Sequence, residues 1–551
     1  MNKTAYVCKY TPVELLKAFG GECEILNHMP QGFDVADQYV GANICGFGKT
    51  VIEDVAAGKV KELVLVNCCD TIKSVYDVLD ASHKLDFIFF MDLPHDANGC
   101  GRMVMKAELM RLAEAYGSYK GTTFSKEKFA AAFQRRTPDS GDHIAVLGAR
   151  MGNELYKMAA ETMPIKVRNY SCVNSRTVTD NEVPETTDFE ELMDWYAAEL
   201  LAQFPCMRMT DSTGRRQVLE APGLKGIIYH TVRFCDFYGF EYAALNRENK
   251  SIPLIKIESD YTTQSEGQMR TRLEAFREEL GFESTESKRK TNKMGKGFFA
   301  GIDSGSTSTD VAILDKDKNM IAGIIIPTGA GAAISAENAL QQALKKAGLA
   351  REDIDNIVTT GYGRDAIQSG DRSITEITCH AKGAHFLDPS VRTVIDIGGQ
   401  DSKAIHLDEN GNVLNFAMND KCAAGTGRFL DMMSHTMQMS LDEMSQCGLT
   451  YDEDITISSM CSVFAESEVV SLIAANKKKD DIVHGINKAV AVKTAALVKR
   501  VGGESCYMMT GGVSKNKGLV KTLSEHLGEP ITISEDAQLC GAIGAALFAI
   551  S

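Results

Sequence analysis

The sequence lacks the marks of a membrane-spanning or secreted protein. Its 551 residues contain no uninterrupted apolar run of about 18 residues, the length that a spanning helix needs. The best candidate, residues 320–334, is interrupted by Gly, Pro and Thr. The N-terminal residues have no apolar core behind their charges, so no secretory signal is visible. We expect a cytoplasmic protein with no membrane partner.

A surplus of basic residues is also missing. Lys and Arg total 59 against 74 Asp and Glu, which gives a net charge of -15. Nucleic acids and anionic membranes are bound mainly by basic protein surfaces, so neither is expected as the main partner. The shares of hydrophobic (44%) and charged (24%) residues are ordinary for a globular protein, and the length favours two to four domains.

Two common nucleotide-binding motifs are absent. The chain has no GxxxxGK(S/T) and no GxGxxG after a strand. This excludes a P-loop NTPase and a classical dinucleotide fold.

The sequence has no CxxC pair, which argues against a zinc ribbon and a thioredoxin motif. It nevertheless has 15 cysteines, and a reducing compartment makes structural disulfides unexpected. A single cysteine is usually a small buried hydrophobe. The nine in the first half are harder to explain in this way, because distant cysteines can meet at a metal or cluster. They are Cys8, Cys23, Cys45, Cys68, Cys69, Cys100, Cys172, Cys206 and Cys235.

The chain divides at a polar, basic stretch, residues 284–296, which is typical of an interdomain linker. Before it, apolar runs of strand length alternate with helical patterns, which predicts parallel sheets covered on both faces. We expect two such α/β subdomains, residues 1–140 and 141–283, followed by an α/β domain at 297–551. The expected strands are 61–68, 85–91, 143–148, 226–230, 253–257 and 392–397, and the expected helices are 105–119, 125–135 and 484–501.

Three glycine-containing turns follow strands in the last part of the chain. In such turns backbone N–H groups and hydroxyls can face phosphate oxygens, and an acidic residue can hold Mg²⁺ through water. An acid opens the first two turns. The turns comprise Asp303, Ser304, Gly305, Ser306 and Thr307, then Asp396, Gly398, Gly399 and Gln400, then Gly511 and Gly512.

This order of turns resembles the actin, Hsp70 and sugar-kinase superfamily, in which two related α/β domains close on ATP. The resemblance assigns Ser304 to Thr307 and Gly398-Gly399 to the phosphates, and Gly511-Gly512 to adenosine. It implies catalytic roles, with Mg²⁺, for Asp303, Asp396 and Gln400.

Two cysteines lie between the second and third turns, in NDKCAAGTGRFL (Cys422) and CSVFAESEV (Cys461). Each precedes an expected helix, whose N-terminus favours a thiolate. With TGYGRD, TEITCHAKGA and IDIGGQDSKAI, these segments resemble the activators of 2-hydroxyacyl-CoA dehydratases. The resemblance implies a homodimer with one [4Fe–4S] cluster on its two-fold axis, held by Cys422 and Cys461 of each copy. It also implies ATP-driven electron transfer, with ferredoxin or flavodoxin as the donor, in an anaerobic host.

The first half resembles the second subunit of 2-hydroxyacyl-CoA dehydratases through CCDTIKSVYDVL, FIFFMDLPHD and KGIIYHTVRFCDFYGFE. This resemblance implies a second iron–sulfur cluster, bound by Cys45, Cys69 and Cys235. Cys172 and Cys206 also fall where cysteines recur in that family. Together with Cys68 and Cys100, these cysteines outnumber the ligands that one [4Fe–4S] cluster needs. The surplus would suit the double-cubane cluster of a related branch of the family. One cubane or two remains open at this point.

The preferred hypothesis is an ATP-driven reductase whose N-terminal half dehydrates a 2-hydroxyacyl-CoA or performs a related difficult reduction. True dehydratases pair two such subunits and this chain has one, so a separate dehydratase subunit and a homodimer both stay open. Two alternatives are a small-molecule kinase, which needs neither Cys422 nor Cys461, and an ATP-gated regulatory protein with a non-catalytic first half.

Overall fold

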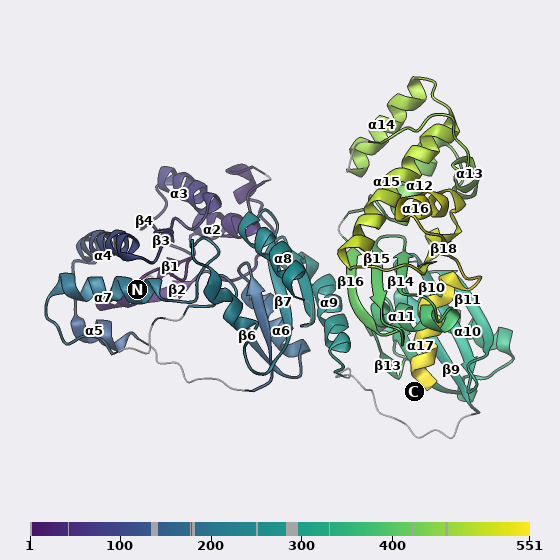
Figure 1. Ribbon diagram of the computed structural model, residues 1–551, viewed down its shortest axis with the longest axis horizontal. Helices are drawn as coiled ribbons and strands as arrows, with labels where there is room; N and C mark the ends of the chain where they lie inside the picture. Colours follow the sequence, from purple (N-terminus) through teal and green to yellow (C-terminus); the bar gives the residue numbers. More distant parts are fainter. Residues whose placement is uncertain are drawn as a thin grey trace. The chain divides into compact units, whose positions relative to one another are not determined.

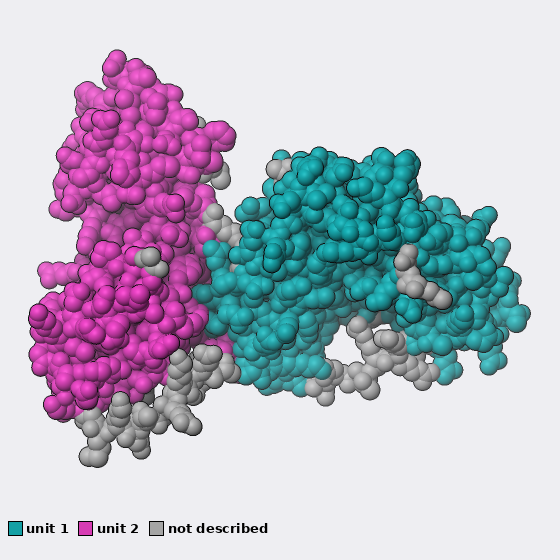
Figure 2. All heavy atoms as spheres, turned by 180° about the vertical axis from the view of Figure 1, so that it is seen from behind, with its two compact units in different colours: residues 1–276 teal, residues 277–551 magenta. Residues whose placement is uncertain are grey.

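The computed structural model describes residues 3–550 except 42, 134–140, 177, 179–181, 250–251, 283–295, 330, 421 and 458–460. The chain forms two compact units, Met1–Phe276 and Arg277–Ser551 (Figures 1 and 2). Of the expected linker at 284–296, all but Lys296 lies outside the described residues.

The first unit begins with a four-stranded parallel sheet in the order β2-β1-β3-β4. Every residue of β3 is buried, as expected for a strand covered on both faces. The strands expected at 61–68 and 85–91 are confirmed as β3 and β4. The elements are β1 (Thr4–Tyr6), α1 (Val13–Ala18), β2 (Cys23–Ile25), α2 (Gly46–Ala56), β3 (Glu62–Val66), α3 (Asp70–Ser82), β4 (Phe87–Met91), α4 (Gly99–Lys120) and α5 (Lys126–Ala131).

A second four-stranded parallel sheet follows, in the order β6-β5-β7-β8. Both sheets of this unit are therefore parallel and wound with helices, which confirms the predicted fold class. The elements are β5 (His143–Gly148), α6 (Asn153–Thr162), β6 (Lys166–Asn169), α7 (Phe189–Leu201), β7 (Leu224–Val232), α8 (Asp236–Glu248), β8 (Leu254–Ser259) and α9 (Glu266–Glu279).

The second unit contains two five-stranded sheets, β11-β10-β9-β12-β13 and β16-β15-β14-β17-β18. In each sheet two antiparallel pairs are followed by two parallel pairs. This duplicated plan is the expected actin and sugar-kinase architecture. The strands are β9 (Phe298–Ser304), β10 (Ser308–Asp315), β11 (Met320–Pro327), β12 (Ile354–Thr360), β13 (Arg372–Ser373), β14 (Thr393–Ile397), β15 (Ser402–Leu407), β16 (Val413–Asn419), β17 (Tyr507–Thr510) and β18 (Ile531–Thr532).

The helices of this unit fall into two groups (Figure 1). The first sheet is packed against α10 (Ala332–Ala347) and α17 (Cys540–Ile550), and α11 (Glu376–Leu387) contacts α17 and strands β14, β15 and β16 of the second sheet. Helices α11 and α17 cross so closely that a Cβ on Gly383 or Gly544 would collide with the other helix's backbone. The second group is α12 (Gly427–Met437), α13 (Leu441–Cys447), α14 (Ser462–Ala474), α15 (Lys479–Arg500) and α16 (Lys517–Leu527).

Helix α15 supplies much of the hydrophobic core beside the second sheet of this unit. Its residues Ile486, Val490 and Leu497 are buried, as the sequence predicts. Within the described ranges, no helix combines the length and the apolar character that crossing a membrane requires.

Candidate functional site

A cavity of about 660 Å³ lies in the second unit, where the predicted glycine turns meet. This volume is in the range of small-molecule sites. Of the predicted nucleotide-binding residues, Ser304 alone does not line the cavity. Its side chain is buried, and its carbonyl accepts a hydrogen bond from the Gly363 N–H at 3.0 Å. The others that line it are Asp303, Gly305, Ser306, Thr307, Asp396, Gly398, Gly399, Gln400, Gly511 and Gly512.

The three turns lie in direct contact with one another. The first joins β9 to β10 and the second joins β14 to β15. A Cβ on Gly399 would overlap the Oγ1 atom of Thr307, so the first and second turns are in direct contact. Gly511 has a φ of 80° and would place a Cβ 2.6 Å from the Ile397 carbonyl oxygen. Only glycine satisfies both demands at that position.

A buried histidine links the two acids that open the phosphate turns. His380 of α11 has Nε2 at 3.4 Å from Asp303 Oδ2 and Nδ1 at 3.6 Å from Asp396 Oδ1. Burial opposes a charged imidazole, but the charge of Asp396 and the hydrogen bond to Asp303 raise the pKa of His380 well above its ordinary value. Burial likewise raises the pKa of Asp396, but His380 and Lys403 outweigh it and lower that pKa to about 2.

The buried amine of Lys403 contacts three acidic side chains in the wall of the cavity. The Nζ of Lys403 lies 2.7 Å from Asp401 Oδ2, 3.2 Å from Asp396 Oδ2 and 3.5 Å from Glu376 Oε1. Tyr362 donates its hydroxyl to Asp401 at 3.0 Å. These contacts hold the carboxylate of the second turn charged and in place. Sequence reasoning missed this network, although its residues lie within the segments TGYGRD, TEITCHAKGA and IDIGGQDSKAI.

Asp310 of β10 is a second acid beside Asp303. Its Oδ1 atom is buried and has no hydrogen-bond partner in the described part of the chain. Burial, followed by the charge of Asp303, raises the pKa of Asp310 to about 8. An orphaned buried carboxylate oxygen is costly without a cation. The residues present therefore fit the expected Mg²⁺.

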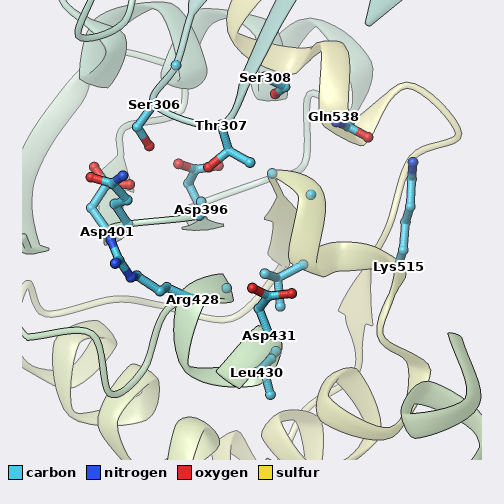
Figure 3. A pocket seen from close by; sticks show the side chains of 18 of the residues that line it. Ser306, Thr307, Ser308, Asp396, Asp401, Arg428, Leu430, Asp431, Lys515 and Gln538 are labelled. Carbon is cyan, nitrogen blue, oxygen red and sulfur yellow. The ribbon is translucent and has the colours of Figure 1, made fainter. Parts of the chain in front are cut away.

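The far side of the cavity is formed by residues that the glycine pattern did not indicate. Figure 3 shows Ser306 and Thr307 on one side and Arg428, Leu430 and Asp431 of α12 on the other. Lys515 and Gln538 complete the rim.

Cys422 and Cys461 are both exposed on the second unit. Cys461 is the residue immediately before α14, and Cys422 lies in the loop before α12. Lys493 of α15 is half-buried, and burial lowers the pKa of its amine, while the charges of Cys422 and Cys461 act in the opposite direction. The two thiols thus lie near the same amine, although they come from different loops.

The first unit holds a second cysteine site. A pocket of about 90 Å³ is lined by seven thiols: Cys8, Cys45, Cys68, Cys69, Cys172, Cys206 and Cys235. All five cysteines predicted for this half are among them. Cys68 is one of the cysteines beyond the needs of a single cluster, and the sequence indicates no role for Cys8. Cys100, the other surplus cysteine, lies outside the pocket and is exposed on α4.

Local structure explains why these cysteines meet. Cys45, Cys69 and Cys235 each stand immediately before a helix, α2, α3 and α8. The free N–H groups of a helix start favour an anionic ligand there. Cys69 and Cys235 also follow the carboxyl ends of parallel strands β3 and β7, where loops of α/β sheets build sites.

The remaining thiols form contacts of their own. Cys172 and Cys206 interact closely enough to shift each other's pKa, and Cys68 does the same with Cys8 and Cys69. The hydrogen bond to Cys172 lowers the pKa of Cys206 against the effect of burial, with the charge of Lys9 acting in the same direction.

Two buried cations also line this pocket. Lys9 is 2% exposed and donates to Ser175 Oγ at 3.0 Å and to the Phe204 carbonyl. Arg150 donates to the Val7 and Leu26 carbonyls and lies over the Phe47 ring. Among the described residues, no three His, Cys, Asp or Glu side chains converge as a single-ion site. Thiolates on different irons of a cluster need no such convergence, so thiols and cations together suit an anionic cluster.

The sequence matches two families, in different halves. The pattern of the BadF/BadG/BcrA/BcrD ATPase family matches residues 300–549. The pattern of the 2-hydroxyglutaryl-CoA dehydratase D-component matches residues 8–140 and 135–280.

Individual proteins agree with the match in the second half. The chain is 45% identical over 249 residues to the 2-hydroxyisocaproyl-CoA dehydratase activator of Clostridioides difficile, covering 45% of this chain and 93% of that protein. It is 44% identical over 250 residues to the (R)-2-hydroxyglutaryl-CoA dehydratase activating ATPase of Acidaminococcus fermentans, covering 45% and 95%. The crystal structure of component A of the A. fermentans (R)-2-hydroxyglutaryl-CoA dehydratase aligns with a TM-score of 0.45 and a sequence identity of 42%. The alignment covers 46% of this chain and 97% of that one.

Proposed function

Since the chain belongs to the BadF/BadG/BcrA/BcrD ATPase family in its second half and carries a 2-hydroxyglutaryl-CoA dehydratase D-component domain in its first, we propose that it is an ATP-driven reductase. ATP hydrolysis would send low-potential electrons into the N-terminal half, which dehydrates a 2-hydroxyacyl-CoA or performs a related difficult reduction. The observation that carries this proposal is the seven-thiol pocket in the same chain as the ATPase.

In the ATPase, the chain's own residues bind and orient the nucleotide. The first two turns would bind the phosphates and Gly511-Gly512 the adenosine. Asp303 and Asp310 would hold Mg²⁺, and Gln400 would orient the attacking water. His380 contacts Asp303 and Lys403 contacts Asp396, so both acids are held in place and the site needs little reorganisation during hydrolysis.

Cys422 and Cys461 would hold a [4Fe–4S] cluster together with the same pair from a second copy of the chain. Both thiols are exposed, as a cluster shared between two copies requires. The neighbouring helix α14 exposes Val463 (62%), Phe464 (68%) and Val470 (52%). Exposed apolar side chains beside the thiols support a homodimer through this region.

The first unit would hold the second iron–sulfur cluster. Cys45, Cys69 and Cys235 would form one ligand set, and Cys8, Cys172 and Cys206 a second, so we favour a double-cubane cluster over a single cubane. Such clusters supply one electron at a time at low potential when bound. Lys9 and Arg150 would compensate the negative charge. The proposed donor is ferredoxin or flavodoxin, and a separate dehydratase subunit is the alternative to a homodimer.

The deciding experiment is anaerobic purification of the full chain with iron and sulfide analysis. Cys422→Ala and Cys461→Ala should each lose about four iron atoms per dimer, because four thiolates bind one [4Fe–4S] cluster. Cys506→Ala, which changes another exposed thiol of the same unit, should lose none. Iron-free wild-type protein with normal ATP hydrolysis would refute the proposal and favour a kinase, whose phosphorylated product would then be sought.

A further inference from the structure

We propose that Tyr238 sets the reduction potential of the iron–sulfur cluster in the first unit, by donating its hydroxyl to the sulfur of Cys206. The inference rests on the proposed function, in which Cys206 is a ligand of the second set. It adds a residue that binds no iron and acts on the cluster through one of its ligands. Tyr238 is therefore a positioning residue.

The contact lies inside the seven-thiol pocket. Tyr238 lines this pocket and is 4% exposed, and Cys206 is 8% exposed. The hydroxyl oxygen of Tyr238 is 3.7 Å from the Sγ atom of Cys206, a distance at which a hydroxyl can donate to sulfur. A cysteine that binds iron is a thiolate and has no proton to donate. The phenol keeps its proton at neutral pH, so Tyr238 is the donor.

The ring of Tyr238 is held beside a largely buried ion pair. The guanidinium of Arg215 lies 5.5 Å from the ring centroid and donates to Glu241 Oε2 at 2.8 Å. The Tyr229 hydroxyl lies 2.5 Å from the same carboxylate oxygen and 3.0 Å from the Tyr238 carbonyl oxygen. These contacts fix the ring and the backbone. The cation also makes the phenol a stronger donor, because nearby positive charge favours negative charge on its oxygen.

The backbone of Cys206 is held as well. Its N–H donates to the hydroxyl of Tyr10 at 3.3 Å, and Tyr10 is fully buried. Two residues earlier, the carbonyl of Phe204 accepts a hydrogen bond from the buried amine of Lys9. The sulfur of Cys206 therefore has little freedom to move away from Tyr238.

Tyr238 also connects the two proposed ligand sets. Cys235, a ligand of the first set, stands immediately before α8, and Tyr238 is the third residue of this helix. Its backbone thus lies in the helix turn that follows one ligand, while its hydroxyl contacts Cys206 of the other set. A change at this side chain acts on the second set and leaves the first set's backbone in place.

The expected effect is electrostatic. Reduction adds negative charge that the cluster shares with its sulfurs, so a hydrogen bond to a ligating sulfur stabilises the reduced form more than the oxidised form. Loss of the bond should therefore lower the reduction potential. Because the Tyr238 hydroxyl binds no iron, its removal should leave the cluster in place. A changed potential with an unchanged iron content separates this role from a purely structural one.

The test measures the potential of the first unit's cluster in the full-length protein. Every protein carries Cys422→Ala, which removes the proposed cluster of the second unit. Iron is counted first, and the cluster is then titrated with titanium(III) citrate and followed by electron paramagnetic resonance. Tyr238→Phe should keep the iron content of this parent. It should lower the equilibrium constant for reduction about tenfold, which is about 59 mV for one electron.

A control and a second variant complete the design. Tyr156→Phe is the matched control, because Tyr156 donates its hydroxyl to the Val167 carbonyl at 2.9 Å and does not line the pocket. It should keep the potential of the parent. Replacement of Tyr238 by 3-fluorotyrosine preserves the shape and makes the hydroxyl a stronger donor, so the potential should rise. This variant decides the matter if Tyr238→Phe loses iron.

An unchanged potential in iron-loaded Tyr238→Phe would overturn the inference and leave the proposed function intact. So would an equal drop in Tyr156→Phe, or a potential that fails to rise with 3-fluorotyrosine. A parent protein without iron in the first unit would refute the proposed function, and the inference with it. The iron count thus distinguishes the two failures.

Discussion

The Nζ atom of Lys403 lies 2.7 Å from Oδ2 of Asp401, inside the wall of the nucleotide cavity. Lys403→Met would leave Asp401 and Glu376 buried without their cation, and Asp396 with His380 alone. Removing one partner of a buried ion pair costs about 3–5 kcal/mol. We expect a clear fall in the thermal midpoint of the ATPase unit and loss of ATP hydrolysis. Lys477→Met, which breaks the exposed pair with Glu453, should change neither, and an equally stable Lys403→Met variant would contradict the role assigned to Lys403.

The contact between the first two turns predicts a large effect of one methyl group. In Gly399→Ala the added Cβ would overlap Thr307 Oγ1 and push the turns apart. Overpacking of this kind costs about 1–3 kcal/mol, so the affinity for an ATP analogue should fall about tenfold or more. Gly239→Ala, on α8 of the first unit, is the control, since Gly239 does not line the cavity and nothing lies within 4 Å of its added Cβ. Calorimetric titration of both variants measures the difference, and similar affinities would refute the prediction.

Cys8 provides a test of the second ligand set. Cys8→Ser should lower the iron content by about four atoms per chain or more, because one cubane loses a ligand. Cys23→Ser, at a half-buried cysteine outside the pocket, should keep the wild-type content. Iron and sulfide analysis of anaerobically purified protein decides the matter. Unchanged iron in Cys8→Ser would reduce the ligand set to that of a single cubane.

The first unit should lose stability as the pH rises. The Nε2 of His28 lies 3.3 Å from Oδ1 of buried Asp54, and this hydrogen bond raises the pKa of His28. The stabilisation is complete below the unfolded pKa of about 6.5 and is lost as the pH rises through the higher folded pKa. His28→Gln should remove this part of the pH dependence.

Urea unfolding followed by the fluorescence of Trp195 measures it, because the chain has one Trp and it lies on α7 of the first unit. Lys3→Gln, which breaks an exposed ion pair with Glu24 on the same unit, is the control and should keep the wild-type pH dependence. The same pH profile in wild-type and His28→Gln protein would exclude the assignment.

Local sequence signals were enough to predict the parts of the site that sit on turns and helix starts. Gly398, Gly399 and Gly511 follow apolar strands, and Cys422 and Cys461 precede expected helices, so a short window contains this information. Cys45, Cys69 and Cys235 are indicated by the family resemblance alone. The strands β3 and β5 are fully buried and appear as apolar runs.

Other parts could not be predicted because they depend on contacts between distant segments. Glu376 and His380 lie inside α11 and Lys403 lies on β15. No pattern near them indicates that they are buried beside Asp396. Cys8 follows a strand of three residues, too short for a periodic signal. Its place in the pocket follows from the order of the parallel strands.

The crossing of α11 and α17 has a mechanical consequence. Gly383 and Gly544 bring the two helices backbone to backbone, and the Cys540 thiol of α17 donates to the His380 carbonyl of α11 at 3.5 Å. Because the contact is close-packed, a displacement of one helix is passed to the other. Helix α11 also carries His380, which touches one acid from each sheet. A displacement of this helix pair therefore changes both acid contacts together.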